Sequence, residues 1–368
     1  MRSQFPQELV DEILDHFDIG DSETLKACSL VGRAWVFRAR SILFRKCFIH
    51  PATIRTFRDL SRSKNCTFKR HIRSIDVTRH CGDPNDHLFT ETAPDVVELV
   101  GVRDLQMSFT CTGPHAFYCT VFVAAFPRVT RLTIRFEDHL DQPMPIIEMI
   151  CLLPALQELY MQWMKNDIIA NPPPSAIPPH GLHAVHFDGG PSVVPILTWL
   201  TSTDHLHNLD SITFSQLNDS EFQIVHESLR QLGPNLHHLE LDLYGMILFY
   251  VDPSAVFDLT LHPNLQTLTI RDDMMEQDTL FQVITRLVAP NLERLSVHFD
   301  PHLGSDSENW DKWAALDPFF NATRFPSLQS VTFICYRPEE VDDDTHDDTR
   351  LRASLPLLVA SGKYRTGW

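Results

Sequence analysis

The feature that most constrains the fold of this chain is an internal repeat with a period near 27 residues. Its units share the form apolar-x-x-apolar-x-apolar, usually just after a proline, as in Pro154–Met161 and Pro263–Ile270. The first apolar position of each unit lies at residue 72, 102, 129, 156, 182, 209, 236, 265, 292 or 328. A unit this short cannot bury its own apolar face, so successive units must stack on one another.

Each unit is predicted to hold one strand and one helix. The second and third apolar positions alternate with other residues, which is the pattern of a half-buried strand. All thirty named positions are Ile, Leu, Val, Met or Phe, whereas the interleaved positions are nearly all polar. Apolar residues at helical spacing lie between strands, as in Glu221–Leu232 and Asp278–Val288. Expected N-caps are Asp219 or Ser220 for the first of these helices and Asp278 for the second.

This pattern resembles leucine-rich repeats of the strand–helix kind. The resemblance implies an α/β solenoid with a parallel sheet on its concave face. We expect the solenoid over residues 72–336 in about ten units, after a helical spacer or cap at 51–71. The Asn or Cys that usually follows the third apolar position in that family is mostly missing here.

The N-terminal residues lack the repeat and predict three short helices. The first helix carries an apolar stripe at helical spacing, formed by Leu9, Val10, Ile13, Leu14 and Phe17. Gly20 and Asp21 end it, a second helix starts near Ser22, and a third is expected over Arg33–Phe44. Helices this short bury little, yet the segment holds more large apolar residues than its core needs. Such an excess usually marks a partner interface.

The order Phe5-Pro6-x-Glu8-Leu9-x-x-x-Ile13-Leu14, then Leu25-x-x-Cys28-x-Leu30-Val31-x-x-x-Trp35, resembles the F-box. The sequence from Leu25 to Trp35 is similar to that of the large fungal F-box family. Residues 1–50 would then be the F-box domain of an F-box protein with a repeat-type substrate domain. The resemblance implies docking on a Skp-family adaptor and, through it, on the cullin and RING subunits of an SCF-type ubiquitin ligase. The repeats would hold a protein substrate that the sequence does not identify.

The resemblance assigns the adaptor interface to these residues: Phe5, Pro6, Leu9, Val10, Ile13, Leu14, Leu25, Leu30, Val31 and Trp35. About half of them, Leu25 and Trp35 especially, are expected to serve the helical core, while Pro6 and Leu9 are expected to be interfacial. The chain itself would then catalyse nothing and need no cofactor. It would raise the effective concentration of its substrate near the ligase.

A solenoid offers the polar face of its sheet and the adjoining loops for binding. The candidate substrate-binding residues on that face are Arg131, Arg135, Tyr160, Trp163, His186, His238, Glu240, Asp242, Arg271 and Arg294. Tyr160 with Trp163, and Arg271 with Arg294, are the expected anchors, because Tyr, Trp and Arg dominate interface hot spots. The alternative for each residue is a solvated position with no dedicated ligand.

Two segments depart from the repeat. The proline-rich stretch Asn171–Pro179 is expected to be an extended spacer or a lip over the concave face. Residues 337–348 are strongly acidic and predict a surface loop, without the residue order of an EF-hand. A closing helix over Thr349–Ala360 is expected within a C-terminal cap and tail, residues 349–368.

Charge and composition argue against several function classes. The chain has 31 Lys and Arg against 48 Asp and Glu, a net charge of −17, although residues 1–80 alone carry +6. An acidic body argues against nucleic acid as the main partner. A membrane span needs roughly 18 consecutive apolar residues, and no run approaches that length. The N-terminus lacks a secretory apolar region, and eight cysteines without a C-x-x-C pair predict reduced thiols in the cytoplasm and/or nucleus.

The sequence carries none of the common motifs for catalysis or metal binding. The sequence contains no H-E-x-x-H, G-x-x-x-x-G-K-[ST], G-x-S-x-G or G-x-G-x-x-G. The histidine pairs 183/186, 205/207 and 237/238 fall within the repeat frame, and no convincing third metal ligand lies near them. Three hypotheses stay open: an SCF substrate receptor, an F-box scaffold working outside ubiquitination, and an enzyme whose site no motif reveals.

Overall fold

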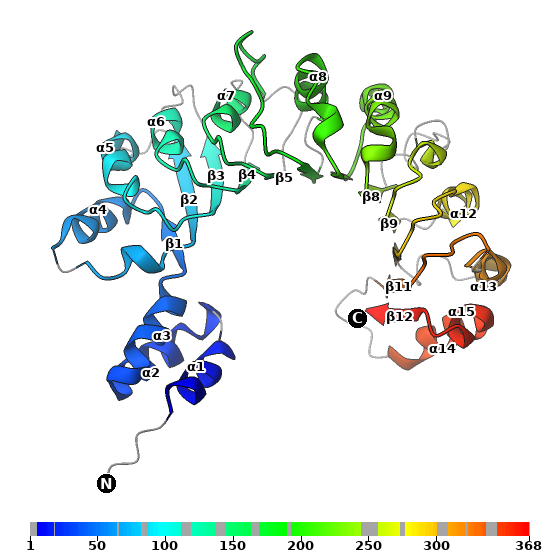
Figure 1. The fold of residues 1–368 in the computed structure, drawn as a ribbon, viewed down its shortest axis with the longest axis horizontal. Coiled ribbons are helices and arrows are strands. Elements are labelled where there is room, and N and C mark those ends of the chain that lie inside the picture. The colour runs from blue at the N-terminus through cyan, green and yellow to red at the C-terminus, as the bar shows by residue number, and fades with distance from the viewer. Residues whose placement is uncertain are drawn as a thin grey trace. The chain divides into compact units, whose positions relative to one another are not determined.

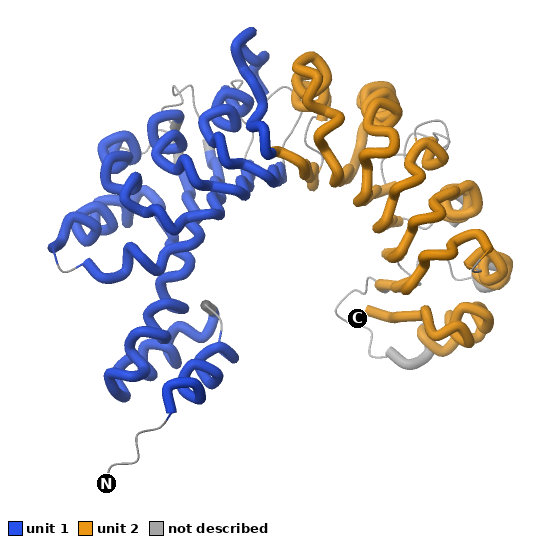
Figure 2. Tube along the Cα trace, viewed as in Figure 1, with its two compact units in different colours: residues 1–162, 167–181 blue, residues 163–166, 182–368 orange. Residues whose placement is uncertain are grey.

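In a computed structural model the chain divides into two compact units, Met1–Gln162 with Asp167–Gly181 and Trp163–Asn166 with Leu182–Trp368 (Figure 2). The structure describes residues 6–17, 19–64, 66–81, 85, 87–111, 119–136, 144–162, 169–189, 193–243, 257–272, 277–299, 308–320, 323–335 and 344–367. Within these ranges the fold is α/β, and neighbouring strands pair in parallel and in sequence order. The α/β class and the parallel sheet predicted from the repeat are therefore confirmed.

The first unit begins with three helices and continues as alternating strands and helices, with its helices α4–α7 on one side of the sheet (Figure 1). Its elements are α1 (Gln7–Asp15), η1 (Ile19–Asp21), α2 (Ser22–Val31), α3 (Arg33–Leu43), β1 (Lys46–Ile49), α4 (Ile54–Arg62), η2 (Lys69–His71), β2 (Ser74–Cys81), α5 (His87–Val96), β3 (Asp104–Cys111), α6 (Cys119–Ala124), β4 (Arg131–Phe136), α7 (Ile146–Cys151) and β5 (Glu158–Gln162). Strands β1 to β5 form successive parallel pairs.

The second unit repeats the same arrangement (Figure 1). Its elements are β6 (Ala184–Asp188), α8 (Val194–Ser202), η3 (Leu206–Asn208), β7 (Ser211–Phe214), η4 (Asp219–Glu221), α9 (Phe222–Leu232), η5 (Gly233–Asn235), β8 (His238–Asp242), η6 (Leu259–Leu261), β9 (Thr267–Asp272), α12 (Gln277–Arg286), β10 (Arg294–Phe299), α13 (Glu308–Leu316), η7 (Asp317–Phe320), β11 (Ser330–Cys335), α14 (Asp344–Ser354), α15 (Pro356–Ala360) and β12 (Tyr364–Gly367). Strands β6 to β12 again form successive parallel pairs.

The core consists of apolar columns that run across the strands. All thirty apolar positions named from the repeat are at most 3% exposed. The register places equivalent residues side by side, so that Leu105 pairs with Leu132 and Leu132 with Leu159. Each repeat thus buries its inward side chains between its own helix and the equivalent side chains of the neighbouring repeats, as a stacked array requires.

The Pro-Asn dipeptide ahead of several strands has a structural reason. Proline ends the preceding helix because it cannot continue the hydrogen-bond ladder. The Asn264 side-chain amide then donates to the Pro234 carbonyl of the preceding repeat at 2.9 Å. Asn291 makes the same bond to Pro263 at 3.1 Å. These asparagines satisfy turn carbonyls of the preceding repeat.

Helix α9 starts differently from the sequence expectation. Its N-cap was expected at Asp219 or Ser220, but these residues form a 3-10 turn, and Asn218 makes a capping box with Glu221. The Glu221 carboxylate also accepts the Val193 backbone N–H at 3.1 Å, although it is only 1% exposed. Burial raises the pKa of Glu221, against the lowering effect of these backbone hydrogen bonds. One carboxylate thereby fixes the starts of α8 and α9.

The sheet extends beyond the repeats recognised in the sequence. Strand β1 lies inside residues 1–50, which were expected to be purely helical, and it pairs with β2 from Lys46↔Ser74 to Ile49↔Val77. The segment 51–71, expected to be a helical spacer or cap, contains α4 and η2 and lies between the paired strands β1 and β2. The array in the first unit therefore begins near residue 46.

The C-terminal segment also differs from the prediction. Helix α14 begins at Asp344, inside the acidic stretch expected to be a loop, while residues 337–343 lie outside the described ranges. The expected single closing helix is two helices followed by strand β12, because Pro356 starts a new helix. The Asp317 carboxylate accepts the backbone N–H groups of Leu357 at 2.7 Å and Leu358 at 2.9 Å, which caps α15.

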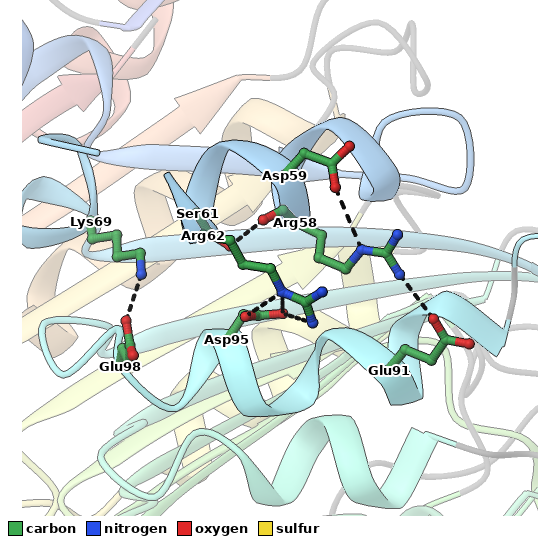
Figure 3. A network of polar contacts seen from close by, with 8 residues as sticks. All are labelled: Arg58, Asp59, Ser61, Arg62, Lys69, Glu91, Asp95 and Glu98. Atoms are coloured by element: carbon green, nitrogen blue, oxygen red, sulfur yellow. Dashed lines mark hydrogen bonds and ion pairs between the residues drawn. The ribbon is translucent and has the colours of Figure 1, made fainter. Parts of the chain in front are cut away.

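Ion pairs join successive repeats at the start of the array: two link α4 to α5, and a third links η2 to the residues after α5 (Figure 3). The pairs are Arg58–Glu91 at 2.9 Å, Arg62–Asp95 at 2.9 Å and Lys69–Glu98 at 2.5 Å. Each pair joins a basic residue of one repeat to an acidic residue of the next. These contacts neutralise part of the basic charge that the sequence concentrates in residues 1–80.

The stacked columns predict a sharp contrast between neighbouring residues of one strand. Leu268→Ala removes a fully buried side chain of β9 and should lower the free energy of unfolding by about 2–5 kcal/mol. Thr269→Ala changes the next residue, on the polar face, and should cost less than about 1 kcal/mol. Urea unfolding followed by circular dichroism measures both. Equal losses would contradict the assignment of faces.

Candidate functional site

The three N-terminal helices close a small apolar core of their own. Val10, Leu14, Leu25 and Ala39 are fully buried in it. Partly buried side chains packed against this core are Phe17, Cys28, Trp35, Ile42 and Leu43. Helices α1 and α2 both contact α3, so the core lies among all three. This core needs none of the remaining apolar residues of α1 and α2.

Those remaining residues are exposed. Leu9 is 44% and Ile13 38% exposed on α1, while Leu30 is 86% and Val31 68% exposed at the end of α2. Pro6, ahead of α1, is exposed as well. Leu9 and Ile13 are four residues apart and therefore share one side of their helix. The N-terminal segment thus presents an outward apolar set, Pro6, Leu9, Ile13, Leu30 and Val31, in addition to its core.

The ten residues expected at an adaptor interface therefore separate into two groups. Val10, Leu14 and Leu25 have no exposed surface and can only support such an interface from within. Trp35 packs against the same core, as expected for it and Leu25. The outward apolar set supplies the surface, and Phe5 lies outside the described residues. Sequence reasoning missed Phe37 of α3, which is also exposed and lies beneath the Arg70 guanidinium.

On the polar face of the first unit, Arg131 is the centre of a charged cluster. Its guanidinium pairs with Glu158 at 2.7 Å and lies 5.3 Å from the centre of the Tyr160 ring. The Tyr160 hydroxyl donates to the same Glu158 carboxylate at 3.0 Å, and Asp104 lies 3.9 Å from Arg131. Burial raises the pKa of Tyr160, and the Glu158 charge raises it further. The phenol therefore stays protonated and can keep donating.

The second unit carries a hydrogen-bonded chain across four neighbouring strands. His186 Nδ1 lies 2.8 Å from the Thr213 hydroxyl, and this hydroxyl donates to Glu240 at 3.5 Å. Glu240 pairs in turn with Arg271 at 2.5 Å. Because the hydroxyl donates to Glu240, it accepts from His186 when Nδ1 carries the proton. These side-chain contacts thus link β6, β7, β8 and β9 in addition to their backbone pairing.

Two further histidines on this face are held neutral. Burial, together with the nearby Arg271 charge, lowers the pKa of His298 to about 4. Burial also lowers the pKa of His238, whose neighbours Asp210 and Arg294 act in opposite directions. At neutral pH the positive charge of this region therefore comes from arginines rather than histidines.

The other expected substrate residues are placed individually. Arg135 donates to Gln162, and Arg294 is exposed at the start of β10. Asp242 is only 6% exposed and lies opposite Arg271 of the neighbouring strand, so little of its carboxylate is open to a substrate. Trp163 lies outside the described residues. Arg271 and Arg294 occupy different rows of the sheet, opposite His298 and Thr267 respectively, and do not form one anchor.

Sequence reasoning missed two partners of these residues, Asp104 and Thr213, and did not pair Glu158 with Arg131. A signal for them exists, because Arg131–Glu158, His186–Thr213 and Thr213–Glu240 are each 27 residues apart. In a parallel stack of this period, residues one repeat apart become neighbours. Complementary side chains at that spacing therefore predict contacts.

Neither metal ligation nor membrane crossing is indicated within the described ranges. No three His, Cys, Asp or Glu side chains there come together as a metal site. No helix in those ranges has the length and apolarity needed to cross a bilayer. Cys28, Cys47, Cys66 and Cys151 are free thiols. Burial raises the pKa of Cys47 and of Cys151 to about 11, which keeps these thiols protonated and poorly nucleophilic.

Comparison with known proteins adds little to this geometry. No family model matches the sequence, and no curated protein does either. Among solved structures, a Bacteroides fragilis protein determined by a structural genomics consortium is similar over 88% of this chain and 73% of its own. The identity is 13% and the TM-score 0.39.

The neutral state of His298 predicts a specific pH dependence of stability. An unfolded histidine has a pKa of 6.5, so the unfolded chain takes up a proton before the folded chain, whose His298 pKa is about 4. The stabilisation is therefore complete above pH 6.5 and declines as the pH falls towards 4. His298→Gln should flatten this decline, measured as urea midpoints at pH 7.5 and 4.5. The exposed His207 offers a matched control in His207→Gln; a His298 variant that declines like wild type would contradict the assignment.

Proposed function

We propose that this protein is the substrate-recognition subunit of an SCF-type ubiquitin ligase. Its N-terminal helices would be an F-box that docks on a Skp-family adaptor, and its repeats would bind a protein substrate. The observation that carries the proposal is the outward apolar set on a helical segment whose own core is already complete. The F-box-like residue pattern of this segment supports the same assignment.

The outward apolar set exposes a large part of its surface to water. Leu30 at 86% and Val31 at 68% exposure leave much of two apolar side chains in solvent. Covering such surface stabilises a complex by about 25 cal/mol per Å² of apolar area. Leu9 and Ile13 add a second exposed strip on α1. An apolar surface of this kind typically marks a protein interaction site.

The polar face of the sheet is proposed as the substrate surface. Arg131 and Arg271 already have carboxylate partners there, Glu158 and Glu240. A substrate must therefore add hydrogen bonds to these pairs or exchange its own carboxylate for one of them. Recognition would depend on hydrogen-bond pattern and shape more than on net charge.

In this proposal the chain has no catalytic step of its own and needs no cofactor. The adaptor links it to cullin and RING subunits, and tethering raises the concentration of the substrate at the ligase. The protein would work in the cytoplasm and/or nucleus, without nucleic acid or membrane as a partner. A second candidate, a scaffold with the same adaptor contact but outside ubiquitination, differs only in whether cullin joins the complex.

The adaptor contact predicts a selective loss of binding. Leu9→Asp combined with Leu30→Asp places two charges in the outward apolar set and leaves the buried core residues intact. Affinity for a co-expressed Skp adaptor should fall at least thirtyfold, about 2 kcal/mol, because a charge is desolvated without a partner. Pull-down and calorimetry measure the loss.

The matched control is Leu357→Asp, which makes the same change at a side chain that is 60% exposed on α15. It should bind the adaptor like wild type, and all variants should keep the wild-type melting temperature. An adaptor that fails to bind wild type, or that binds the double variant equally well, would refute the docking proposal. Recruitment of cullin to the wild-type complex would separate the receptor from the scaffold.

A further inference from the structure

A basic cleft lies in the first unit, at the turns that lead into β2 and β3. It has a volume of about 560 Å³. Its lining residues are Lys69, Arg70, Arg73, Glu98, Val100, Gly101 and Arg103. Four of the seven are cations and one is an anion, in a chain whose net charge is −17. The adaptor and substrate surfaces described above use none of these residues.

Two guanidinium groups converge on one three-residue turn, 100–102. Arg103 Nη1 donates to the Val100 carbonyl at 3.1 Å and to the Val102 carbonyl at 3.0 Å. Arg73 Nη1 lies over Gly101, so close that a Cβ at this glycine would be 2.0 Å from it. The same Nη1 donates to the Arg70 and Ile72 carbonyls at 3.0 and 3.2 Å. Main-chain carbonyls therefore hold both guanidiniums in place.

The charges in the cleft are incompletely balanced. Glu98 pairs with Lys69 at 2.5 Å, as Figure 3 shows. Among the described residues, Arg73 and Arg103 have main-chain carbonyls as partners and form no ion pair with a carboxylate. Elsewhere in this unit, Arg58, Arg62 and Arg131 each pair with an acidic side chain. Two like charges are thus fixed beside one turn, with no carboxylate partner among the residues that the structure describes.

The neighbouring His71 reports the resulting positive potential. It is 7% exposed and lies beside the cleft, within hydrogen-bonding distance of Arg70. Burial lowers its pKa, and the charges of Arg70, Arg73 and Arg40 lower it further. The positive charge of the surrounding arginines therefore disfavours protonation of His71.

We propose that this cleft binds a phosphate ester, with Arg73 and Arg103 contacting the phosphoryl oxygens. Guanidinium groups present forked donors that match phosphate oxygens. A phosphoryl group carries up to two negative charges. It can therefore balance the charges of both arginines, whereas a single carboxylate would balance only one. The cleft is larger than one phosphate needs, and the exposed Val100 offers apolar contact to the organic part of an ester.

A compact ligand fits the rest of the chain better than an extended anionic surface. Beyond residue 80 the chain carries 23 more acidic than basic residues, since the total is −17 and residues 1–80 contribute +6. A nucleic acid or an anionic membrane contacts an extended surface, and a chain with this overall acidic charge disfavours both. A single phosphoryl group contacts only the cleft itself. The inference stands independently of the proposed ligase function.

Calorimetric titration of inorganic pyrophosphate into the full chain, at low salt, tests the proposal. Arg73→Gln with Arg103→Gln should weaken binding at least about tenfold, because charge-assisted hydrogen bonds to phosphate are lost. The matched control, Arg55→Gln with Arg128→Gln, removes two exposed arginines outside the cleft and changes the net charge equally. It should bind pyrophosphate within about twofold of wild type.

Gly101→Ala tests the geometry without changing any charge. The added methyl would lie 2.0 Å from Arg73 Nη1 and 2.9 Å from the Ile72 carbonyl, so the guanidinium must move. Pyrophosphate binding should weaken about fivefold or more while the melting temperature confirms folding. If Gly101→Ala does not fold, the double arginine variant and its control carry the test.

Two probes distinguish the source of the phosphoryl group. A serine peptide is titrated in its phosphorylated and unphosphorylated forms beside pyrophosphate. Selective binding of the phosphorylated peptide, tighter than pyrophosphate, would support a phosphorylated protein side chain; the reverse order would support a small phosphorylated compound. If neither pyrophosphate nor the phosphorylated peptide binds, or if the double arginine variant binds as well as its control, the proposal is overturned.

Discussion

The parallel pairing of each strand with the equivalent strand of the next repeat is the constraint on which this structure depends. It places equivalent residues of adjacent repeats side by side, as in Leu105↔Leu132↔Leu159. An apolar residue at such a position is buried only if its neighbours one repeat away are apolar too. The free energy gained by burying the core therefore depends on contacts between repeats, and no single repeat has a closed core of its own.

The same pairing decides where function can reside. Inward positions and helix faces are occupied by packing, so binding must use positions that the stack leaves outside. Three such surfaces emerge: the polar strand face with its Arg131 and Glu240 pairs, the basic turn cleft around Gly101, and the outward apolar set of α1 and α2. They differ in chemistry, with hydrogen-bonded ion pairs, uncompensated arginines and bare apolar side chains respectively. Each suits a different kind of partner.

How far the sequence predicts this structure depends on whether a position repeats. Every inward residue of the ten recognised units is buried, because a period of about 27 residues specifies contacts with both neighbours. The terminal strands were missed because they break the repeat pattern: Lys46–Ile49 has Cys47 at the second apolar position, and Tyr364–Gly367 has Ser361 and Thr366 at the first and third. Polar positions were less predictable: alternation places Asp242 on the polar face, yet it is only 6% exposed. Within α1, helical spacing alone could not decide that Val10 is core and Leu9 surface.

Hydrogen–deuterium exchange of the full chain, with and without a Skp-family adaptor, is the most direct test of the central claim. The account predicts added protection confined to α1, α2 and the turn before α3, where the outward apolar set lies. Exchange in the strands, already slowed by the parallel ladder, should stay unchanged. Protection that appears instead on the strand face, or no change in α1 and α2 at adaptor saturation, would contradict the assignment of these helices as the docking element.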